Sequence, residues 1–412
     1  MIDVLIVGAG PAGISASIVC ARAGLNVKVV DEFVRTGGRL LGQLHEEPNG
    51  KWWNGIEIAE RLVAEARELG VEFDMGVSVY NLKQLGDEWK VYTAKETVRV
   101  KALLLATGAA ETALPIAGWT LPGVMSIGAA QVMTNVHRVR PGQRGVIIGV
   151  NILSTAIARE LVLAGVEVES MLLPVKSLMT EEDGDPGKVM ELLLRVAHLA
   201  PSKILRFGSG LMKSASMKRL GLKFYPKSGF RVWGIPVKLR QAVVEIVGSK
   251  QVEGVRVVDI DVEGNPVEGS ERLIAADFVC IAGGLYPLVE LAAVAGCPFR
   301  YIEELGGHVP VHSENMKTGL KGLYVAGNIT GIESAKVAMA QGEVAGYSIA
   351  EDLLLNRSFE GPLRAALEKV ESTRQNAVIQ FHPKIEKGRE QMEMAFKVLE
   401  AETGNQLYVK KG

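Results

Sequence analysis

Hydrophobic positions at the start of the chain form a nearly unbroken run, IDVLIV at residues 2–7, which is typical of a parallel strand buried on both faces. A helical pattern follows as far as Gly24, and a second apolar run, NVKVV, ends at Asp31 and Glu32. The order strand, helix, strand predicts a βαβ unit at the amino terminus.

Three glycines, Gly8, Gly10 and Gly13, lie in the turn GAGPAG between this strand and the helix. Gly8 permits a tight turn, Gly10 lets a pyrophosphate approach the backbone, and Gly13 lets the helix pack closely on the strand. The start of the helix offers free N–H groups to the phosphates. Asp31 follows Gly8 by 23 residues, a position from which a carboxylate can accept hydrogen bonds from ribose hydroxyls. These residues predict a dinucleotide site and do not distinguish FAD from NAD.

The pattern of apolar positions recurs over residues 144–173, where the strand GVIIG, a helix and the strand VEVESMLL form a second predicted βαβ unit. Gly149 matches Gly8, but Asn151 replaces the second glycine of the motif and Ser154 the third. A side chain at position 151 intrudes where a pyrophosphate should meet bare backbone, and no acid follows at the position expected for the ribose. We interpret this unit as a retained fold with altered or lost NAD(P) binding; a nucleotide in an unusual pose is the alternative.

Three further apolar segments end in small residues: KALLLATG at residues 101–108, AADFVCIAGG at 275–284 and GLYVAGN at 322–328. We expect each to be a strand that ends at the first cofactor, and a long helix to follow the last of them.

Taken together, the strand–GxGxxG–helix–strand–acid unit, the internal ATG, the second βαβ unit and the closing YVAGN resemble the two-dinucleotide-fold flavoprotein oxidoreductases. These are relatives of thioredoxin reductase and the pyridine nucleotide–disulfide reductases, and the resemblance extends from residue 2 to about residue 354. It implies that the first fingerprint binds FAD, that the ATG turn closes the FAD domain, and that the last glycine pair holds the ribityl and phosphate portion. A strand near Val79 would give the adenine a backbone contact. The implied FAD-binding residues are Gly8, Gly10, Pro11, Ala12, Gly13, Asp31, Glu32, Gly38, Arg39, Val79, Thr107, Gly108, Gly327, Asn328 and Ser334.

Asn328 departs from the aspartate that the family has at this position. An amide still accepts a hydrogen bond from a ribityl hydroxyl and also donates, so we expect weakened rather than abolished binding. The segment from Gly331 to Ser334 would place a helix N-terminus near the pyrimidine edge of the flavin, where its partial positive charge would stabilise the anionic reduced flavin.

A narrower resemblance comes from TGGRLLGQ at residues 36–43 and GWTLPGVMSIGAAQVM at 118–133. Both are similar to the FAD-containing α subunits of heteromeric amine-oxidising enzymes: dye-linked proline dehydrogenase, opine and octopine dehydrogenase, hydrogen cyanide synthase and heterotetrameric sarcosine oxidase. This implies that a partner flavoprotein subunit oxidises the amine, and that the α-type subunit passes electrons onward or reduces its flavin with NADH. Many members continue into a Cys-rich [2Fe–2S] domain. No cysteine follows Cys297 here, so an iron–sulfur relay would sit on another, small subunit or be absent.

Composition narrows the functional classes. The chain has 412 residues, 48% of them hydrophobic, and a formal net charge of −1, which excludes a disordered chain and gives no basic excess for nucleic-acid binding. We find no apolar run long enough to span a bilayer and no signal-peptide pattern at the start, and therefore expect a soluble cytoplasmic protein.

Only three cysteines are present, Cys20, Cys280 and Cys297, and no two lie within ten residues of each other. That spacing excludes a CxxC redox pair and a four-cysteine metal or iron–sulfur site, so we expect no disulfide reductase activity. Cys20 and Cys280 are expected to be small buried hydrophobes. The histidines match no known ligand spacing, and we expect no metal site.

The pair Trp52–Trp53, with Gln43 and His45 shortly before it, leaves two interpretations open. It could cover the flavin, or it could anchor a surface loop. No catalytic residue is assigned.

These observations predict an α/β fold of two Rossmann-like dinucleotide-binding domains, the second inserted into the first, with a C-terminal helical tail. The expected divisions are residues 1–113 and 298–356 for the FAD domain, 114–297 for the second domain and 357–412 for the tail. The predicted function is that of an FAD-dependent oxidoreductase, the FAD and electron-transfer subunit of a heteromeric amine or amino-acid dehydrogenase. The alternatives are a stand-alone NAD(P)H-dependent flavin oxidoreductase and a non-redox nucleotide-binding subunit.

Overall fold

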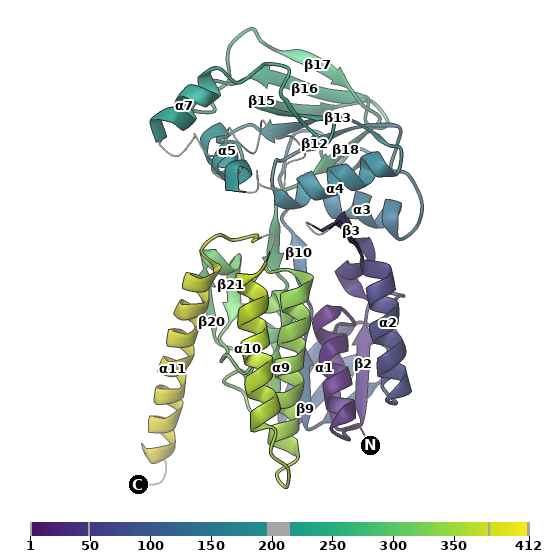
Figure 1. Ribbon diagram of the computed structural model, residues 1–412, viewed down its shortest axis with the longest axis vertical. Helices are drawn as coiled ribbons and strands as arrows, with labels where there is room; N and C mark the ends of the chain where they lie inside the picture. Colours follow the sequence, from purple (N-terminus) through teal and green to yellow (C-terminus); the bar gives the residue numbers. More distant parts are fainter. Residues whose placement is uncertain (1, 48–49, 196–214, 378–379, 410–412) are drawn as a thin grey trace. The chain divides into compact units, whose positions relative to one another are not determined.

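A computed structural model describes residues 2–47, 50–195, 215–377 and 380–409 of the chain (Figure 1). The chain divides into two compact units. Unit 1 comprises Met1–Leu41, Asn54–Ala110 and Leu285–Gly412, and unit 2 comprises Gly42–Trp53 and Glu111–Gly284.

Unit 1 is built on a five-stranded parallel sheet in the order β22-β9-β1-β2-β5. The central strands consist almost wholly of buried aliphatic residues, because both faces of a parallel sheet are covered. The strands are β1 (Val4–Val7), β2 (Val27–Asp31), β5 (Glu72–Met75), β9 (Ala102–Leu105) and β22 (Leu323–Val325).

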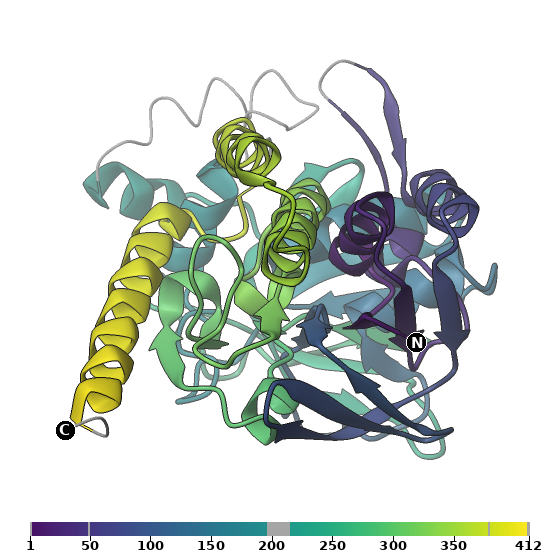
Figure 2. The same ribbon diagram turned by 90° about the horizontal axis from the view of Figure 1, so that it is seen from below.

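Four helices lie side by side over this sheet in unit 1, in the order α2, α1, α9 and α10 (Figures 1 and 2). The approach of α1 to α9 is close: a Cβ at Gly342 would lie only 2.2 Å from the carbonyl oxygen of Ala12. Their bounds are α1 (Pro11–Arg22), α2 (Gly55–Glu68), α9 (Ala335–Leu353) and α10 (Glu360–Gln375).

The remaining elements of unit 1 include a three-stranded antiparallel sheet, β6-β7-β8, whose buried Trp89 joins a hydrophobic cluster with β1 and β9. Helix α11 packs on the β20-β21 pair and on η3. The bounds are η1 (Gly38–Gly42), β6 (Val79–Leu85), β7 (Glu88–Thr93), β8 (Thr97–Val100), β10 (Ala109–Glu111), β19 (Leu285–Pro287), α8 (Glu290–Val294), β20 (Phe299–Ile302), η3 (Glu303–Leu305), β21 (Gly307–Pro310), η4 (Gly327–Thr330) and α11 (Ile385–Val409).

Unit 2 holds an eight-stranded mixed sheet in the order β11-β18-β12-β13-β15-β16-β17, with β14 also paired to β15. Strands β11 through β15 in this order are parallel to their neighbours, and the β15-β16-β17 pairs are antiparallel. The bounds are β3 (Leu44–Glu46), β4 (Trp52–Asn54), β11 (Val124–Ser126), α3 (Ile127–Asn135), β12 (Arg144–Ile148), α4 (Ile152–Leu163), β13 (Glu167–Pro174), α5 (Pro186–Arg195), α7 (Ala215–Lys223), β14 (Phe230–Val232), β15 (Ile235–Val247), β16 (Gly254–Asp259), β17 (Arg272–Ala275) and β18 (Phe278–Ile281).

The expected fold class is confirmed: two α/β units, the second inserted into the first, with a helical C-terminal segment. The boundaries differ from the expected 113/114 and 297/298, since the chain changes unit after Ala110 and again after Gly284. Residues 42–53, expected in the FAD domain, group with unit 2, because side chains of α3 and α4 bind their backbone.

The structure corrects the expectation for one strand end. Strand β18, from the segment 275–284, pairs with β11 and β12 in unit 2 and does not belong to the sheet that carries the first glycine turn. Its apolar sequence predicts a buried strand correctly, but the partner of a parallel strand is distant in sequence and leaves no local signal.

Candidate functional site

Gly8 and Gly13 are required by the packing of unit 1. Gly8 has φ +111°, and a Cβ there would lie 2.3 Å from the carbonyl oxygen of Ala106 at the end of β9. A Cβ at Gly13 would lie 1.9 Å from the carbonyl oxygen of Gly8. Neither space can hold a side chain, so both glycines let β1, β9 and α1 meet closely.

Gly10 has different surroundings. Its backbone is extended, with φ −84° and ψ −174°, and no atom lies within 4 Å of the position that a Cβ would take. It is the N-cap of α1, which carries no side-chain cap and begins with Pro11. A Cβ at Gly38 would lie 2.9 Å from the Cα of Gly10. Bare backbone therefore surrounds the N-terminus of α1, whose first-turn N–H groups, including that of Ala12, can bind a phosphate.

Asp31, at the end of β2, connects the glycine turn to the loop that follows the strand. Its Oδ2 accepts a hydrogen bond from the N–H of Ala9 at 2.6 Å, and its Oδ1 accepts one from the N–H of Phe33 at 2.8 Å. Each carboxylate oxygen keeps a second lone pair that can accept a ribose hydroxyl. Glu32, next to it, is exposed.

The structure places Val79 at the start of β6, two residues beyond the backbone that contacts this strand end. The contact is made by Val77, whose N–H donates to the carbonyl oxygen of Asp31 at 2.9 Å. The backbone nearest to Asp31 in this segment is therefore that of Val77.

The turn after β9 is held by the backbone of Leu288, a residue that the sequence did not single out. The hydroxyl of Thr107 donates to the carbonyl oxygen of Leu288 at 2.6 Å, and the N–H of Leu288 donates to the carbonyl oxygen of Gly108 at 3.0 Å. Arg39 is exposed, and its Nε donates to the carbonyl oxygen of Ala109 at 3.2 Å. The Thr107 hydroxyl thus fixes the turn.

The loop of residues 327–334, between β22 and α9, is ordered by its own side chains and by α9. The N–H of Gly327 donates to Oε1 of Gln341 at 3.0 Å, and Oδ1 of Asn328 accepts from the N–H of Glu333 at 3.3 Å. Ser334 is the N-cap of α9, its hydroxyl accepting from the N–H of Val337 at 3.4 Å. The amide nitrogen of Asn328 remains available to donate to a ligand.

Three of the predicted segments meet at one edge of the unit 1 sheet. Strands β22, β9 and β1 are adjacent and parallel, so the loop 327–334, the turn at Thr107 and the turn at Gly8 all follow the carboxyl ends of neighbouring strands. In α/β sheets this edge is where ligands bind.

Glu333 is the one strongly buried carboxylate of this loop, and it was not predicted. Burial alone would raise its pKa, but Arg389 and Arg374 outweigh burial and hold the pKa below its ordinary value. Nε of Arg374 donates to Oε1 of Glu333 at 2.7 Å. The two arginines lie 41 and 56 residues further along the chain, in α10 and α11, so no local pattern could have indicated the contact.

The second glycine turn, in unit 2, has the same backbone but different chemistry. Gly149 has φ +104°, and a Cβ there would lie 2.3 Å from the carbonyl oxygen of Ala282, as at Gly8. Oδ1 of Asn151 accepts from the N–H of Ser154 at 2.9 Å, and its Nδ2 donates to the carbonyl oxygen of Ala282 at 3.0 Å. The hydroxyl of Ser154 accepts from the N–H of Asn151 at 2.9 Å, which completes a capping box at the start of α4. Donors that would meet a pyrophosphate are therefore already bonded within the protein.

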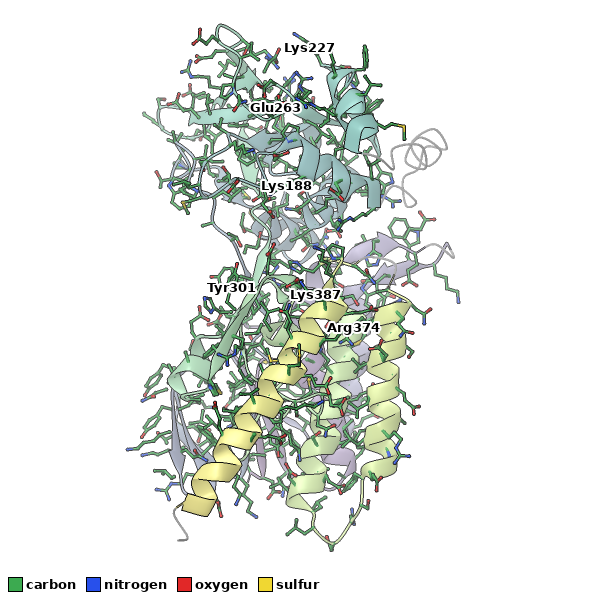
Figure 3. The ribbon with its side chains drawn as sticks, turned by 90° about the vertical axis from the view of Figure 1, so that its left-hand side faces the viewer. Lys188, Lys227, Glu263, Tyr301, Arg374 and Lys387 are labelled. Carbon is green, nitrogen blue, oxygen red and sulfur yellow. The ribbon has the colours of Figure 1, made fainter. Side chains whose placement is uncertain are left out.

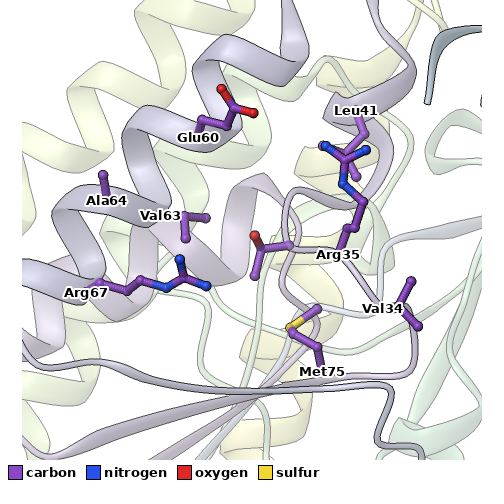
Figure 4. A pocket seen from close by; sticks show the side chains of 9 residues that line it. Val34, Arg35, Leu41, Glu60, Val63, Ala64, Arg67 and Met75 are labelled. Carbon is purple, nitrogen blue, oxygen red and sulfur yellow. The ribbon is translucent and has the colours of Figure 1, made fainter. Parts of the chain in front are cut away.

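A pocket of about 440 Å³ opens in unit 1 between α2 and the loop after β2 (Figure 4). Arg35 from the loop and Arg67 from α2 line it together with Glu60, and none of the predicted cofactor residues does. The full lining is Val34, Arg35, Thr36, Leu41, Glu60, Val63, Ala64, Arg67 and Met75.

The cysteines are all free and buried, as expected for Cys20 and Cys280. Cys20, Cys280 and Cys297 belong to three different hydrophobic clusters, and burial raises the pKa of Cys20 to about 12. In the part of the chain that the structure describes, no group of three or more His, Cys, Asp and Glu residues could hold a metal ion. No described helix has the length and apolar character needed to cross a membrane.

The hairpin of β3 and β4 carries the tryptophan pair. Nε1 of Trp53 donates to Oε1 of Gln43 at 3.0 Å, and the rings of Trp53 and His45 are stacked with centroids 6.0 Å apart. The guanidinium carbon of Arg159 lies 5.7 Å from the ring centroid of Trp52 and 5.1 Å from that of Trp233. These contacts anchor the hairpin within unit 2, and a flavin-covering role for the pair stays a prediction.

Comparison with known proteins adds a family and several relatives. The sequence profile of the family described as pyridine nucleotide-disulphide oxidoreductase matches residues 2–194 and 225–342. One of the two opine oxidase chains of Agrobacterium tumefaciens (strain Ach5), named as a subunit of that enzyme, is 29% identical over 370 residues, covering 86% of this chain and 66% of that protein. Hydrogen cyanide synthase subunit HcnB of Pseudomonas aeruginosa is 26% identical over 405 residues, covering 95% of this chain and 80% of that protein.

The fold is also similar to that of a solved structure, L-proline dehydrogenase from P. horikoshii. The TM-score is 0.63 and the sequence identity 20%, with 90% of this chain and 58% of that chain covered. This likeness concerns the fold. The chain spans about two thirds of the length of the opine oxidase subunit that it matches.

Proposed function

Because the chain belongs to the pyridine nucleotide-disulphide oxidoreductase family, we propose that it is an FAD-dependent oxidoreductase and the electron-transfer subunit of a heteromeric amine or amino-acid dehydrogenase. The substrate class would be that of proline, opines or sarcosine. Two relatives, one from opine oxidase and one from hydrogen cyanide synthase, are themselves named as subunits, which supports a heteromeric assembly.

One observation carries the choice of cofactor site: the two glycine turns share a backbone but differ in whether their helix N-terminus is free. The N-terminus of α1 has no side-chain cap and open space beside Gly10, whereas that of α4 is closed by Asn151 and Ser154. A pyrophosphate can approach the first turn and not the second in the usual manner. This supports FAD in unit 1 and an altered or lost NAD(P) site in unit 2.

The residues at the carboxyl edge of the unit 1 sheet fit FAD. Gly10 and the start of α1 would hold the pyrophosphate, Asp31 the ribose, and Gly327 with Asn328 the ribityl and phosphate portion. Val77 takes the place of Val79 as the backbone nearest to the adenosine end. When bound, FAD supplies a centre that accepts an electron pair and passes electrons on. The N-terminus of α9, capped by Ser334, would orient a positive partial charge toward the flavin.

The partners would be a small iron–sulfur subunit together with a second flavoprotein that oxidises the substrate. The three cysteines lie in separate hydrophobic clusters and cannot form a disulfide or an iron–sulfur cluster within the chain. This supports transfer of electrons to an external acceptor and argues against disulfide reduction.

The test is anaerobic titration of the purified chain after reconstitution with FAD. We expect a flavin absorbance band that dithionite bleaches and that NADH or NADPH leaves unchanged. Rapid bleaching by NADH would instead show a stand-alone NAD(P)H-dependent flavin oxidoreductase. A colourless protein that does not bind added FAD would show a nucleotide-binding subunit without redox chemistry.

A further inference from the structure

The loop 327–334 receives its strongest contacts from the C-terminal helices α10 and α11. Both helices belong to unit 1, α10 lying against α9 and α11 against β20, β21 and η3. Figure 3 shows Arg374 near the end of α10 and Lys387 near the start of α11. The side chains that reach the loop come from the ends of the two helices that lie nearest to each other in the chain.

Glu333 is the residue that they hold. Arg374 makes two hydrogen bonds to it, from Nε to Oε1 at 2.7 Å and from Nη2 to Oε2 at 3.3 Å. Nη2 of Arg389 donates to the same Oε2. The side chain of Glu333 is only 6% exposed, those of Arg374 and Arg389 10% and 15%. All three are therefore largely removed from water, where charged hydrogen bonds are strong and a lost partner is costly.

Arg389 also holds the backbone of the loop directly. Its Nη1 donates to the carbonyl oxygen of Thr330 at 2.9 Å and to the Thr330 hydroxyl at 3.2 Å. That hydroxyl donates in turn to the carbonyl oxygen of Gly327 at 2.8 Å. A Cβ at Gly331 would lie 3.1 Å from Nη2 of Arg389, so the guanidinium rests against the loop.

We propose that the C-terminal helices form part of the FAD site, with Arg374 and Arg389 as positioning residues that hold the loop 327–334 at the ligand edge of the sheet. The inference rests on the proposed function, because it assigns FAD to that edge. Retention of the flavin then depends on two residues of the tail that never need to touch it. The nearest part of the loop to the flavin is Gly327 and Asn328, whose conformation the Thr330 and Glu333 contacts fix.

The cluster also has a charge consequence. Glu333 carries one negative charge and the two arginines carry two positive charges; Glu371, which pairs with Arg374 at 3.0 Å, is half exposed and screened by water. His312 faces Arg389 at 3.4 Å and stays neutral, since burial lowers its pKa to about 3. A net positive charge beside the start of α9 favours the more negatively charged, reduced form of FAD over the oxidised form.

The test compares Arg389→Met and Arg389→Lys with the full-length wild-type chain. The measurements are the Kd of oxidised FAD, from flavin fluorescence, and the Kd of FAD reduced by dithionite, measured anaerobically. For Arg389→Met we expect at least tenfold weaker binding of oxidised FAD and at least a tenfold loss of the preference for reduced FAD. A tenfold change in that preference corresponds to about 30 mV for a two-electron couple.

Arg389→Lys separates charge from geometry. A lysine keeps the positive charge but cannot donate to Thr330 and Glu333 at once. We therefore expect the preference for reduced FAD to be restored while binding of oxidised FAD stays weakened.

Lys387→Met and Lys369→Met are the matched controls. Each removes a cation of the same two helices: Lys387 pairs with Glu304 at 2.8 Å and Lys369 with Glu343 at 2.7 Å, outside the loop. Neither should change either Kd by more than twofold. If Arg389→Met matches these controls, the inference is wrong, although the proposed function stands. If Arg389→Met does not fold, unchanged binding in Arg389→Lys overturns the inference in the same way. Failure of the wild-type chain to bind FAD would instead overturn the proposed function.

Discussion

Gly10 and Gly13 stand three residues apart in one motif, yet their surroundings differ. The Cβ position of Gly13 is occupied by the carbonyl oxygen of Gly8 at 1.9 Å, so the folded protein itself excludes a side chain there. At Gly10 the backbone is extended and the Cβ position is empty, so the folded protein tolerates a side chain. Only a ligand would require Gly10 to be glycine.

Alanine substitutions should separate these two roles. We expect Gly10→Ala to leave the free energy of unfolding of the FAD-free protein unchanged, because its φ of −84° suits any residue, while weakening FAD binding by at least about tenfold. We expect Gly13→Ala to cost about 1–3 kcal/mol of stability even without FAD, because backbone must shift. Urea unfolding of the FAD-free variants and FAD titration measure the two effects. Normal FAD affinity in Gly10→Ala would show that the pyrophosphate does not bind at this turn.

Between elements, Glu160 of α4 connects helix α3 to the hairpin that begins at Gly42. Its carboxylate accepts hydrogen bonds from Nε2 of Gln131 at 2.9 Å, Nδ2 of Asn135 at 2.7 Å and the N–H of Leu44 at 3.2 Å. The same Asn135 nitrogen donates to the carbonyl oxygen of Gly42 at 2.7 Å. Burial nevertheless raises the pKa of Glu160 to about 7, because removal from water outweighs these three donors.

Glu160 should therefore make stability depend on pH. Its pKa is about 7 in the folded protein and about 4.5 ordinarily, so between these values the folded chain holds a proton that the unfolded chain has released. Stability then falls as pH rises from about 4.5 to 7, by up to about 3 kcal/mol. Glu160→Gln should remove this part of the decline in urea midpoints between about pH 5 and 8, relative to wild type. Glu271→Gln, an exposed carboxylate of unit 2, is the control, and an equal effect in both variants would contradict the prediction.

The elements themselves were largely predictable. Buried strands such as β1 and β12 and the helices that follow them were correct because their apolar spacing is a local property of the chain. The missing glycine at Asn151 was also visible, but not that its side chain would complete a capping box with Ser154. The sheet of β18 and the unit of the hairpin at 42–53 were not predictable, because both depend on contacts between residues far apart in sequence.

Across the whole molecule, the tail shows the same limit more strongly. Its amphipathic helices were expected to pack against something, and α10 and α11 do so within unit 1. Their contact with the ligand edge rests on Arg374 and Arg389, which lie in otherwise polar stretches. A charged residue on a polar helix ordinarily predicts an exposed surface, so only the fold reveals that these two are buried with Glu333.

Assembly with a partner is the expectation that belongs to the whole molecule. The chain holds one glycine turn open to a pyrophosphate, and its cysteines are buried in separate clusters, so electrons that reach a bound FAD should leave for another protein. We expect the protein purified from its native source to co-elute with a substrate-oxidising subunit. Amines should then reduce an artificial acceptor only when both proteins are present. Gly10→Ala is the matched control, since it should still bind the partner while losing electron transfer. Robust amine-dependent turnover by the isolated chain would show that this chain carries its own substrate site.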